Sequence, residues 1–225
     1  MGILSDSAFR GKIKAVIFDM DGVLVDSEPA MYKASIAGLR EFGIEAKAED
    51  FKPFVVTGER SFIGNVVRLH GGVYSDEMKD RVYEIYCRDI DREIVRFPAV
   101  LPTVKALRAS GILLAIASAA DAVKVNANIR AAGLDPDDFG AVVKAGDVER
   151  LKPAPDIFLK AAEILGVRPD ECIVCEDAEN GVRAAKAGGM FCLGITSSFS
   201  DERLRELGAD WTAPDIGALG APAKD

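Results

Sequence analysis

The sequence predicts an α/β protein: a doubly wound parallel sheet with a Rossmann-like core and a helical cap inserted after the first strand. Short apolar runs alternate with longer helical patterns and are separated by Gly and Pro, which is typical of βαβ units. The runs are continuous rather than alternating, as in strands buried on both faces of a sheet. One long region after the first run shows only amphipathic helical patterns, so we expect it to fold as an insertion.

Five apolar runs are the expected strands. The first is rich in β-branched residues and ends in acidic residues, and the others repeat its type. The strands we expect are Ile13–Phe18, Leu113–Ala117, Ala141–Val143, Cys172–Cys175 and Phe191–Ile195. The helices we expect between the last four are Asp121–Ala132, Asp156–Leu165 and Asn180–Ala187. Pro155 suits the first turn of the middle helix, because its missing N–H costs nothing there.

The inserted region extends from Pro29 to about Val95 and contains helices with apolar faces. The face of one helix is predicted to consist of Tyr32, Ile36 and Leu39. The face of another is predicted to consist of Met78, Val82, Ile85, Tyr86 and Ile90. We therefore expect a core of residues 1–28 and 98–217, a cap of residues 29–97, and a frayed tail at 218–225.

Composition limits the classes of function. The chain has 28 basic and 36 acidic residues, a net charge of -8, so its long-range field repels nucleic acid and anionic lipid. The longest apolar stretch, Gly111–Ala120, is about half of the ~20 residues that a membrane span needs. Residues 1–10 lack the pattern of a secretory signal. Four cysteines are too few for a disulfide scaffold, which favours the cytoplasm or another reducing compartment. We expect neither a nucleic-acid nor a membrane partner.

The first candidate site follows the first expected strand. Asp19 and Asp21 are two residues apart, and in an extended chain such residues point to the same side. Both would lie beyond the carboxyl end of the strand, where open α/β sheets bind ligands. Two carboxylates this close repel each other and need a cation or a shared proton. Taken alone, the pair could equally be a solvated acidic turn, since Asp-Gly is common turn chemistry.

A second acidic pair favours the metal interpretation. Glu176 and Asp177 follow the expected strand Cys172–Cys175, in the same way as Asp19 and Asp21 follow the first strand. If the two strands are neighbours, three or four carboxylates surround one point. An all-oxygen ligand set suits Mg²⁺ better than Zn²⁺, which prefers nitrogen and sulfur. The sequence therefore predicts a magnesium site at the carboxyl edge of the sheet.

An anion site is expected beside the metal. Ser118 follows the second expected strand, and the main-chain N–H groups of Ala119 and Ala120 follow where the next helix begins. A hydroxyl group and a helix N-terminus together can bind an anion. Lys152 stands next to Pro153, in a segment that by itself could be an ordinary surface turn before a helix. Close to acidic metal ligands and Ser118, its ammonium group would neutralise a phosphate.

With these motifs in this order, the chain resembles the haloacid dehalogenase-like hydrolase superfamily, in its β-phosphoglucomutase-like and phosphatase branch. The residues that carry the resemblance are Asp19–Ser27, Ala117–Ala119, Lys152–Phe158 and Glu176–Asp177 followed by Gly181 and Ala184. The resemblance covers residues 13–28 and about 98–212, and the helical insertion lies where this branch has its cap.

A closer resemblance concerns the phosphatase-like domain of the plant chloroplast proteins called suppressor of quenching. Its evidence is Thr57–Glu59, Ser118–Asp121 and Lys124–Asn128. If it holds, the chloroplast is an alternative compartment, and the chain could be one part of a larger multidomain protein.

The superfamily resemblance implies a Mg²⁺-dependent phosphatase acting on a small phosphorylated metabolite, of the sugar phosphate or phosphoglycolate type. It implies that Asp19 is the nucleophile that forms an aspartyl-phosphate, and that Asp21 acts first as general acid and then as general base. The implied metal ligands are Asp19, the main-chain carbonyl of Asp21, Glu176 and Asp177. The implied phosphate-binding residues are Ser118, Ala119 and Lys152.

Departures from the branch bear on the substrate. Its sugar phosphomutases have a His shortly after the first motif, where this chain has Met31, so the mutase is the second hypothesis. The segment Gly58, Glu59 and Arg60 stands near the place of a cap Arg that binds a distal phosphate in those mutases, although a solvated arginine at a helix start explains Arg60 equally well. A third hypothesis is a catalytically idle binding or regulatory domain, against which the mutually repelling carboxylates argue.

Two other motifs are interpreted as structural. Cys172 and Cys175 have the spacing of a redox pair but lie within an expected strand, whereas redox pairs start helices. His70, the only histidine, precedes Gly71 at a helix end, where a cation complements the helix dipole.

Overall fold

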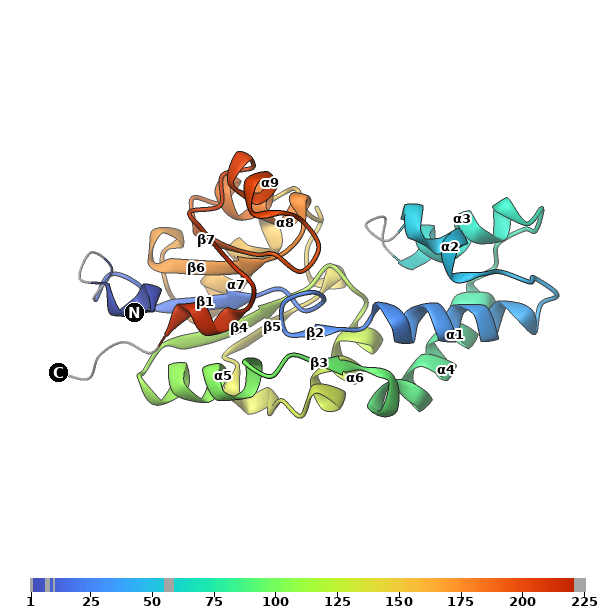
Figure 1. The fold of residues 1–225 in the computed structure, drawn as a ribbon, viewed down its shortest axis with the longest axis horizontal. Helices are drawn as coiled ribbons and strands as arrows, with labels where there is room; N and C mark the ends of the chain where they lie inside the picture. Colours follow the sequence, from blue (N-terminus) through green and yellow to red (C-terminus); the bar gives the residue numbers. More distant parts are fainter. Residues whose placement is uncertain (1, 7–8, 10, 55–58, 221–225) are drawn as a thin grey trace.

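The computed structural model describes residues 2–6, 9, 11–54 and 59–220. Within these residues, a six-stranded parallel sheet with flanking helices forms one half of the molecule, and a group of helices forms the other half (Figure 1). The strand order is β5-β4-β1-β6-β7-β8. The strands are β1 (Ala15–Phe18), β4 (Leu113–Ala117), β5 (Ala141–Val143), β6 (Cys172–Glu176), β7 (Phe191–Ile195) and β8 (Trp211–Ala213). The predicted fold class is confirmed.

Helices cover both faces of the sheet. The helices of the core are α5 (Val100–Ala109), α6 (Ala122–Ala132), α7 (Asp156–Leu165), α8 (Glu179–Ala187) and α9 (Asp201–Glu206). Buried residues of α5 and α6 form one hydrophobic cluster with the sheet, and those of α7, α8 and α9 form a second cluster on its other face. The helices of the inserted region are α1 (Glu28–Arg40), α2 (Ala48–Phe51), α3 (Glu59–Leu69) and α4 (Asp76–Glu93).

All five expected strands are present, but three further strands were not predicted. β8 is a three-residue edge strand with half-buried side chains, too short to give a periodic signal. Its Trp211 packs on Phe9, with ring centroids 5.0 Å apart. The other two, β2 (Val25–Asp26) and β3 (Val95–Arg96), pair with each other antiparallel. They lie just before α1 and just after α4, so they join the two connections to the inserted helices (Figure 1).

The buried face of α4 matches the predicted face, whereas the face of α1 differs. On α1, Tyr32 and Ile36 are only half-buried, and small residues such as Ala34 and Gly38 are buried together with Leu39. The reason is the close contact of the two helices: a Cβ atom on Gly38 would lie 2.9 Å from a methyl group of α4. Because the buried residues of α1 include small ones such as Ala34 and Gly38, hydrophobic periodicity in the sequence indicates this interface only weakly.

The packed core continues past the expected boundary at residue 217. Residues Ile216–Leu219 form a 3-10 turn, and Leu219 is fully buried. Residues 218–219, which were expected in the tail, thus belong to this turn, and residues 221–225 lie outside the described part of the chain. Among the described residues, no helix is both long and apolar enough to cross a bilayer.

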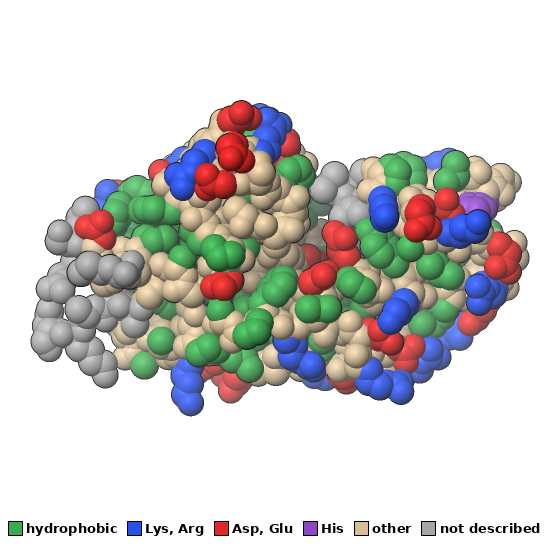
Figure 2. Space-filling view, viewed as in Figure 1, with side chains coloured by type: hydrophobic (Ala, Val, Ile, Leu, Met, Phe, Trp, Pro, Cys, Tyr) green, Lys and Arg blue, Asp and Glu red, His purple; other side chains and the backbone are tan. Residues whose placement is uncertain are grey.

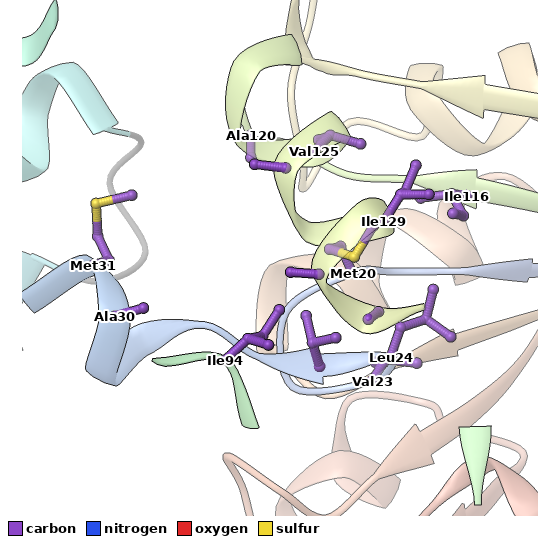
Figure 3. Packing of buried hydrophobic residues seen from close by; sticks show 14 of the residues in the cluster. Met20, Val23, Leu24, Ala30, Met31, Ile94, Ile116, Ala120, Val125 and Ile129 are labelled. Carbon is purple, nitrogen blue, oxygen red and sulfur yellow. The ribbon is translucent and has the colours of Figure 1, made fainter. Parts of the chain in front are cut away.

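Apolar packing fixes the loop after β1 against helix α6. Met20 of this loop lies close to Ile129 of α6 in Figure 3, and Leu24 and Val125 are buried in the same hydrophobic cluster. Asp21 lies between these loop residues, so its backbone is held beside α6. Met31, on α1, lies apart from this group on the side of the inserted helices (Figure 3).

Candidate active site

The sheet topology brings the predicted acidic residues to one edge. Asp19 directly follows β1, Glu176 is the last residue of β6, and Asp177 comes next. Ser118 follows β4. Because β1 lies between β4 and β6 and all three strands are parallel, the four side chains come from neighbouring strand ends. This edge faces the inserted helices, and Figure 2 shows a hollow between the two halves with acidic side chains beside it.

Carboxylate groups converge at this edge. Asp19, Glu176 and Asp177 each offer an oxygen atom, and within the described residues these atoms lie within 4.8 Å of one another. The ammonium group of Lys152 lies 2.5 Å from Asp19 Oδ1 and 2.5 Å from Glu176 Oε1. Its side chain is only 9% exposed. The predicted phosphate-binding lysine is thus inserted directly between two of the carboxylates.

Burial and mutual charge shift the pKa values of the groups in this cluster. Burial raises the pKa of Asp19 above its ordinary value, while the Lys152 ammonium opposes the shift. The pKa of Asp177 is raised well above the ordinary value by burial, and further by the charges of Glu176 and Asp19. Burial lowers the pKa of Lys152, but the two carboxylates outweigh burial and the net shift is upward. One ammonium group therefore does not balance three buried carboxylates.

This charge imbalance fits a divalent cation. The three residues supply only oxygen atoms, which suits a hard cation such as Mg²⁺. A cation would stabilise the ionised carboxylates that burial disfavours. The donor chemistry and the charge of the cluster are thus compatible with the predicted metal site.

The carboxylate of Asp21 lies outside this cluster and has other partners. It accepts a hydrogen bond from the Ser27 hydroxyl at Oδ1. Lys124 Nζ lies 2.8 Å from Oδ2, and Asn128 Nδ2 lies 3.3 Å from Oδ1. The two neighbouring Asp residues therefore have separate surroundings, as a nucleophile and an acid-base group would need.

Ser118 occupies the expected position after β4. It is 3% exposed, and its hydroxyl accepts a hydrogen bond from the Ala120 N–H at 3.3 Å. Ala119 lies between these two residues and is half-buried. The loop thus leads into α6, which begins at Ala122.

The family assignment follows from this arrangement and from a direct match. Residues 13–189 match the family of haloacid dehalogenase-like hydrolases. The chain belongs to this family. The matched segment begins before β1 and ends after α8, so it includes all four motifs that carry the resemblance.

Individual relatives of this hydrolase include plant and bacterial proteins. It is 44% identical over 213 residues to the chloroplastic protein SUPPRESSOR OF QUENCHING 1 of Arabidopsis thaliana, covering 93% of this chain but only 20% of that protein. It is 30% identical over 202 residues to Hexitol phosphatase A of Escherichia coli (strain K12), covering 87% and 89% of the two chains. The structure of CbbY from Rhodobacter sphaeroides with xylulose-(1,5)bisphosphate superposes with a TM-score of 0.79 at 25% identity, covering 93% and 97%. Both resemblances stated from the sequence are confirmed.

Two glycines of the hydrolase make room for its carboxylates. A Cβ atom on Gly181, in α8, would lie 1.8 Å from the Glu176 carboxyl group. A Cβ atom on Gly22 would lie 1.9 Å from Asp177 Oδ2, and Gly22 also has a φ of +76°, which side-chain-bearing residues rarely adopt. The carboxylates can reach their positions only because these two residues lack side chains.

We expect Gly181→Ala to lower the free energy of unfolding. Ala usually stabilises a helix relative to Gly, but here the added methyl group must displace a buried carboxyl group, at a cost of about 1–3 kcal/mol. Gly64→Ala is the matched control, because Gly64 lies in a helix and its Cβ would have nothing closer than 3.5 Å. Urea titration of both variants measures the difference. A Gly181→Ala protein as stable as Gly64→Ala would contradict the close approach of Glu176.

Sequence reasoning missed several polar residues of the site. Lys124 and Asn128 lie one turn apart on α6, and this spacing of two polar residues after the Ser118 loop was the available signal. Asp177 Oδ2 accepts hydrogen bonds from the hydroxyl groups of Ser198 and Ser197, the latter at 3.2 Å. Both serines follow β7, so the run of hydroxyl residues after the fifth expected strand was a second signal.

The predicted cap residues are not brought to the carboxylates by any described contact. Gly58 lies outside the described residues, and Glu59 begins α3. Arg60 is largely exposed, and its guanidinium group lies 3.2 Å from Asp76 and over the Tyr74 ring. A role of these residues in substrate binding stays a prediction.

Neither the cysteine pair nor the histidine that was interpreted as structural is among the residues that converge at the carboxyl edge of the sheet. Cys172 and Cys175 lie in β6 and are buried, and burial raises the pKa of the Cys172 thiol to about 12. Such thiols are inert rather than redox-active. His70 follows α3, and its Nε2 lies 2.9 Å from Asp50 Oδ2.

Proposed function

We propose that this hydrolase is a Mg²⁺-dependent phosphatase that releases phosphate from a small phosphorylated metabolite, of the sugar phosphate or phosphoglycolate type, through an aspartyl-phosphate on Asp19. The observation that carries the proposal is the group formed by Asp19, Lys152, Glu176 and Asp177 at the carboxyl edge of the sheet. The name of the relative Hexitol phosphatase A, and the bisphosphate in the structure of CbbY, support a phosphorylated carbohydrate as the substrate class.

Asp19 is the proposed nucleophile because its carboxylate touches the ammonium group that would also bind a phosphoryl oxygen. The carboxylate attacks phosphorus, the bond from phosphorus to the leaving oxygen breaks, and Asp21 gives its proton to that oxygen. Asp21 then takes a proton from water, which attacks the phosphorus of the aspartyl-phosphate. Phosphate leaves and Asp19 is regenerated.

The other residues of the site balance charge. Lys152 and Ser118, with the main chain at Ala119, would hold the phosphoryl oxygens. Asp19, Glu176, Asp177 and the main-chain carbonyl of Asp21 would hold Mg²⁺, which shields the negative charges of phosphate and nucleophile from each other. The contacts of Lys152 support both roles, because its two carboxylate neighbours are proposed metal ligands.

The inserted helices are the proposed cap. We divide the chain into a core of residues 1–28 and 98–217 and a cap of residues 29–97, which lies over the carboxyl edge and would exclude water from the site. As in the sequence analysis, a cytoplasmic or other reducing compartment is expected. The name of the 44% identical relative supports the chloroplast as the alternative, and its greater length supports a larger multidomain protein.

Hydrolysis is favoured over mutase chemistry by Met31. This residue is buried in α1, and a thioether can neither accept nor donate a proton as the His of the related mutases can. At this position the chain therefore has no proton-transferring group that would delay the attack of water on the aspartyl-phosphate.

We expect inorganic phosphate to appear from a panel of sugar phosphates and phosphoglycolate only when Mg²⁺ is present. Chelation should stop the reaction and added Mg²⁺ restore it, while Ca²⁺ should substitute poorly because of its looser coordination.

Phosphorus NMR, which follows the substrate and both products, distinguishes the phosphatase from the mutase. With β-glucose 1-phosphate and a bisphosphate primer, isomerisation to the 6-phosphate without phosphate release would promote the mutase. Activity that survives thorough chelation would contradict the metal site.

A further inference from the structure

The carboxylate of Asp21 contacts two donors of helix α6, which lie outside the four motifs that carry the superfamily resemblance. Lys124 and Asn128 of α6 contact opposite oxygens of this carboxylate, at 2.8 Å and 3.3 Å. The Lys124 side chain is 12% exposed, and Asn128 is fully buried. A buried amide and a mostly buried ammonium group are costly unless they are paired, so these contacts are specific features of the site.

The orientation of Asn128 is set from the cap. The hydroxyl group of Tyr86, on helix α4, donates a hydrogen bond to Asn128 Oδ1 at 2.5 Å. Burial raises the pKa of Tyr86, so the hydroxyl group keeps its proton and remains a donor. The amide oxygen of Asn128 is thereby occupied, and its NH₂ group is the part that faces Asp21.

The position of α6 is fixed independently of these polar contacts. Val125 and Ile129, each next to one of the two polar residues in the sequence, are buried against the loop that carries Asp21 (Figure 3). Residues 124 and 128 are one helical turn apart and therefore lie on the same face of α6. The helix holds both donors at a constant distance from the Asp21 backbone.

We propose that Lys124 and Asn128 are positioning residues, which hold the Asp21 carboxylate apart from the cluster of Asp19, Glu176 and Asp177 and aim it for proton transfer. This inference rests on the proposed function. Of the donors named above, only the Ser27 hydroxyl would still hold this carboxylate without Lys124 and Asn128. The carboxylate would then spend less time in the pose that reaches the leaving oxygen. Correct orientation is a large part of the catalytic advantage of a general acid.

The test uses two substrates that differ in their need for an acid. The leaving group of an activated aryl phosphate departs as a stable anion without receiving a proton. The alkoxide leaving group of an alkyl phosphate, such as a sugar phosphate, must be protonated as it departs. We expect Lys124→Met to lower kcat on the alkyl phosphate by about 10- to 100-fold, part of the effect of a general acid, and on the aryl phosphate by less than about threefold. KM should change little, and Lys124→Arg should restore most of the lost activity. Asn128→Leu should show the same selective loss.

Lys79→Met is the matched control. Lys79 is another partly buried lysine, and its Nζ lies 2.9 Å from the carboxylate of Asp121, the residue just before α6. The substitution removes the same charge and also breaks a lysine–aspartate pair, but Lys79 does not contact Asp21. Its effect should be equal on the two substrates.

A second measurement does not depend on turnover. Crystal structures of metal-free wild type and Lys124→Met should show the Asp21 carboxylate turned away from its wild-type pose in the variant only. Mg²⁺ affinity measured by calorimetry should be unchanged, because the three clustered carboxylates are intact. If Lys124→Met does not fold, Asn128→Leu, which removes the other donor to Asp21, replaces it in every assay.

The outcomes separate the two proposals. An active wild type, with equal losses on both substrates in Lys124→Met or an unmoved Asp21 carboxylate, would overturn the positioning role and leave the phosphatase in place. A wild type that releases no phosphate from any substrate would overturn the proposed function, and the positioning role would fall with it.

Discussion

Asp19→Asn should reduce phosphate release to background while the fold persists. Asn has almost the shape of Asp, so the packing at the end of β1 is kept, and Lys152 retains its contact with Glu176. What is lost is the charge that attacks phosphorus. Loss of an essential nucleophile typically lowers kcat by a factor on the order of 10³ or more, since only binding and electrostatic stabilisation remain.

The substitution can also be followed by the covalent intermediate. Wild-type protein quenched in acid during turnover should carry one phosphoryl group on the peptide that contains Asp19, as detected by mass spectrometry. Asp19→Asn should carry none, and its circular dichroism spectrum and melting temperature should stay close to those of the wild type. Asp21→Asn is the matched control. It should still be phosphorylated by an aryl phosphate, because the attack itself does not need the acid. Wild-type turnover by Asp19→Asn would refute the proposed mechanism.

The sequence was sufficient for the parts of the site that depend on strand ends. Asp19, Glu176 and Ser118 could be placed together because parallel strands bring their carboxyl ends to one edge, whatever the details of packing. The acidic residues also had an energetic signature, since adjacent carboxylates demand a cation. These arguments need only the order of elements along the chain.

Contacts between distant helices could not be predicted in the same way. Lys124 and Asn128 are polar residues on a helix, and such residues usually face solvent. Only the packing of Val125 and Ile129 on the loop after β1 shows that this polar face is turned inward. Tyr86 was predicted as a core residue, and it is buried. The partner of its hydroxyl group, Asn128, lies on a different helix 42 residues later in the sequence, and such a contact leaves no local pattern.

The role of Lys152 was predicted only in part. Its backbone setting beside Pro153 suggested a fixed cation for phosphate, but the structure also makes it the counter-ion of Asp19 and Glu176. This second role concerns stability as well as catalysis, and sequence spacing contains no information on it.

Lys152→Met should therefore damage both the fold and the activity. In metal-free protein the substitution leaves the buried carboxylates of Asp19 and Glu176 without their ammonium partner, and breaking a buried pair by removing one partner costs about 3–5 kcal/mol. Phosphate release should fall by a factor on the order of 10² to 10³, as for the loss of one donor that stabilises charge in the transition state. Added Mg²⁺ should recover part of the stability, since it would bind the ionised carboxylates of the folded state only.

The loss of stability should depend on pH in a defined direction. Folding raises the pKa values of Asp19 and Asp177. At pH values between the unfolded-state and the folded-state pKa of these groups, the folded protein therefore binds more protons than the unfolded chain. Stability from these groups is therefore present at low pH and is lost as pH rises through the folded-state values. Lys152 lowers the pKa of Asp19, so its removal should make this loss larger. Chemical unfolding at about pH 5 and about pH 8 should show that Lys152→Met is destabilised more at the higher pH, where the carboxylates must ionise.

Lys160→Met provides the comparison that isolates this effect. Lys160 is an exposed lysine whose pair with Glu163 lies on the surface of α7, where ion pairs contribute little. Its removal should change stability slightly at both pH values and should not alter the response to Mg²⁺. If Lys152→Met behaves like Lys160→Met, with no dependence on pH and no recovery by Mg²⁺, then the carboxylates at the sheet edge are not the uncompensated charges described above, and the same cluster could not hold the metal.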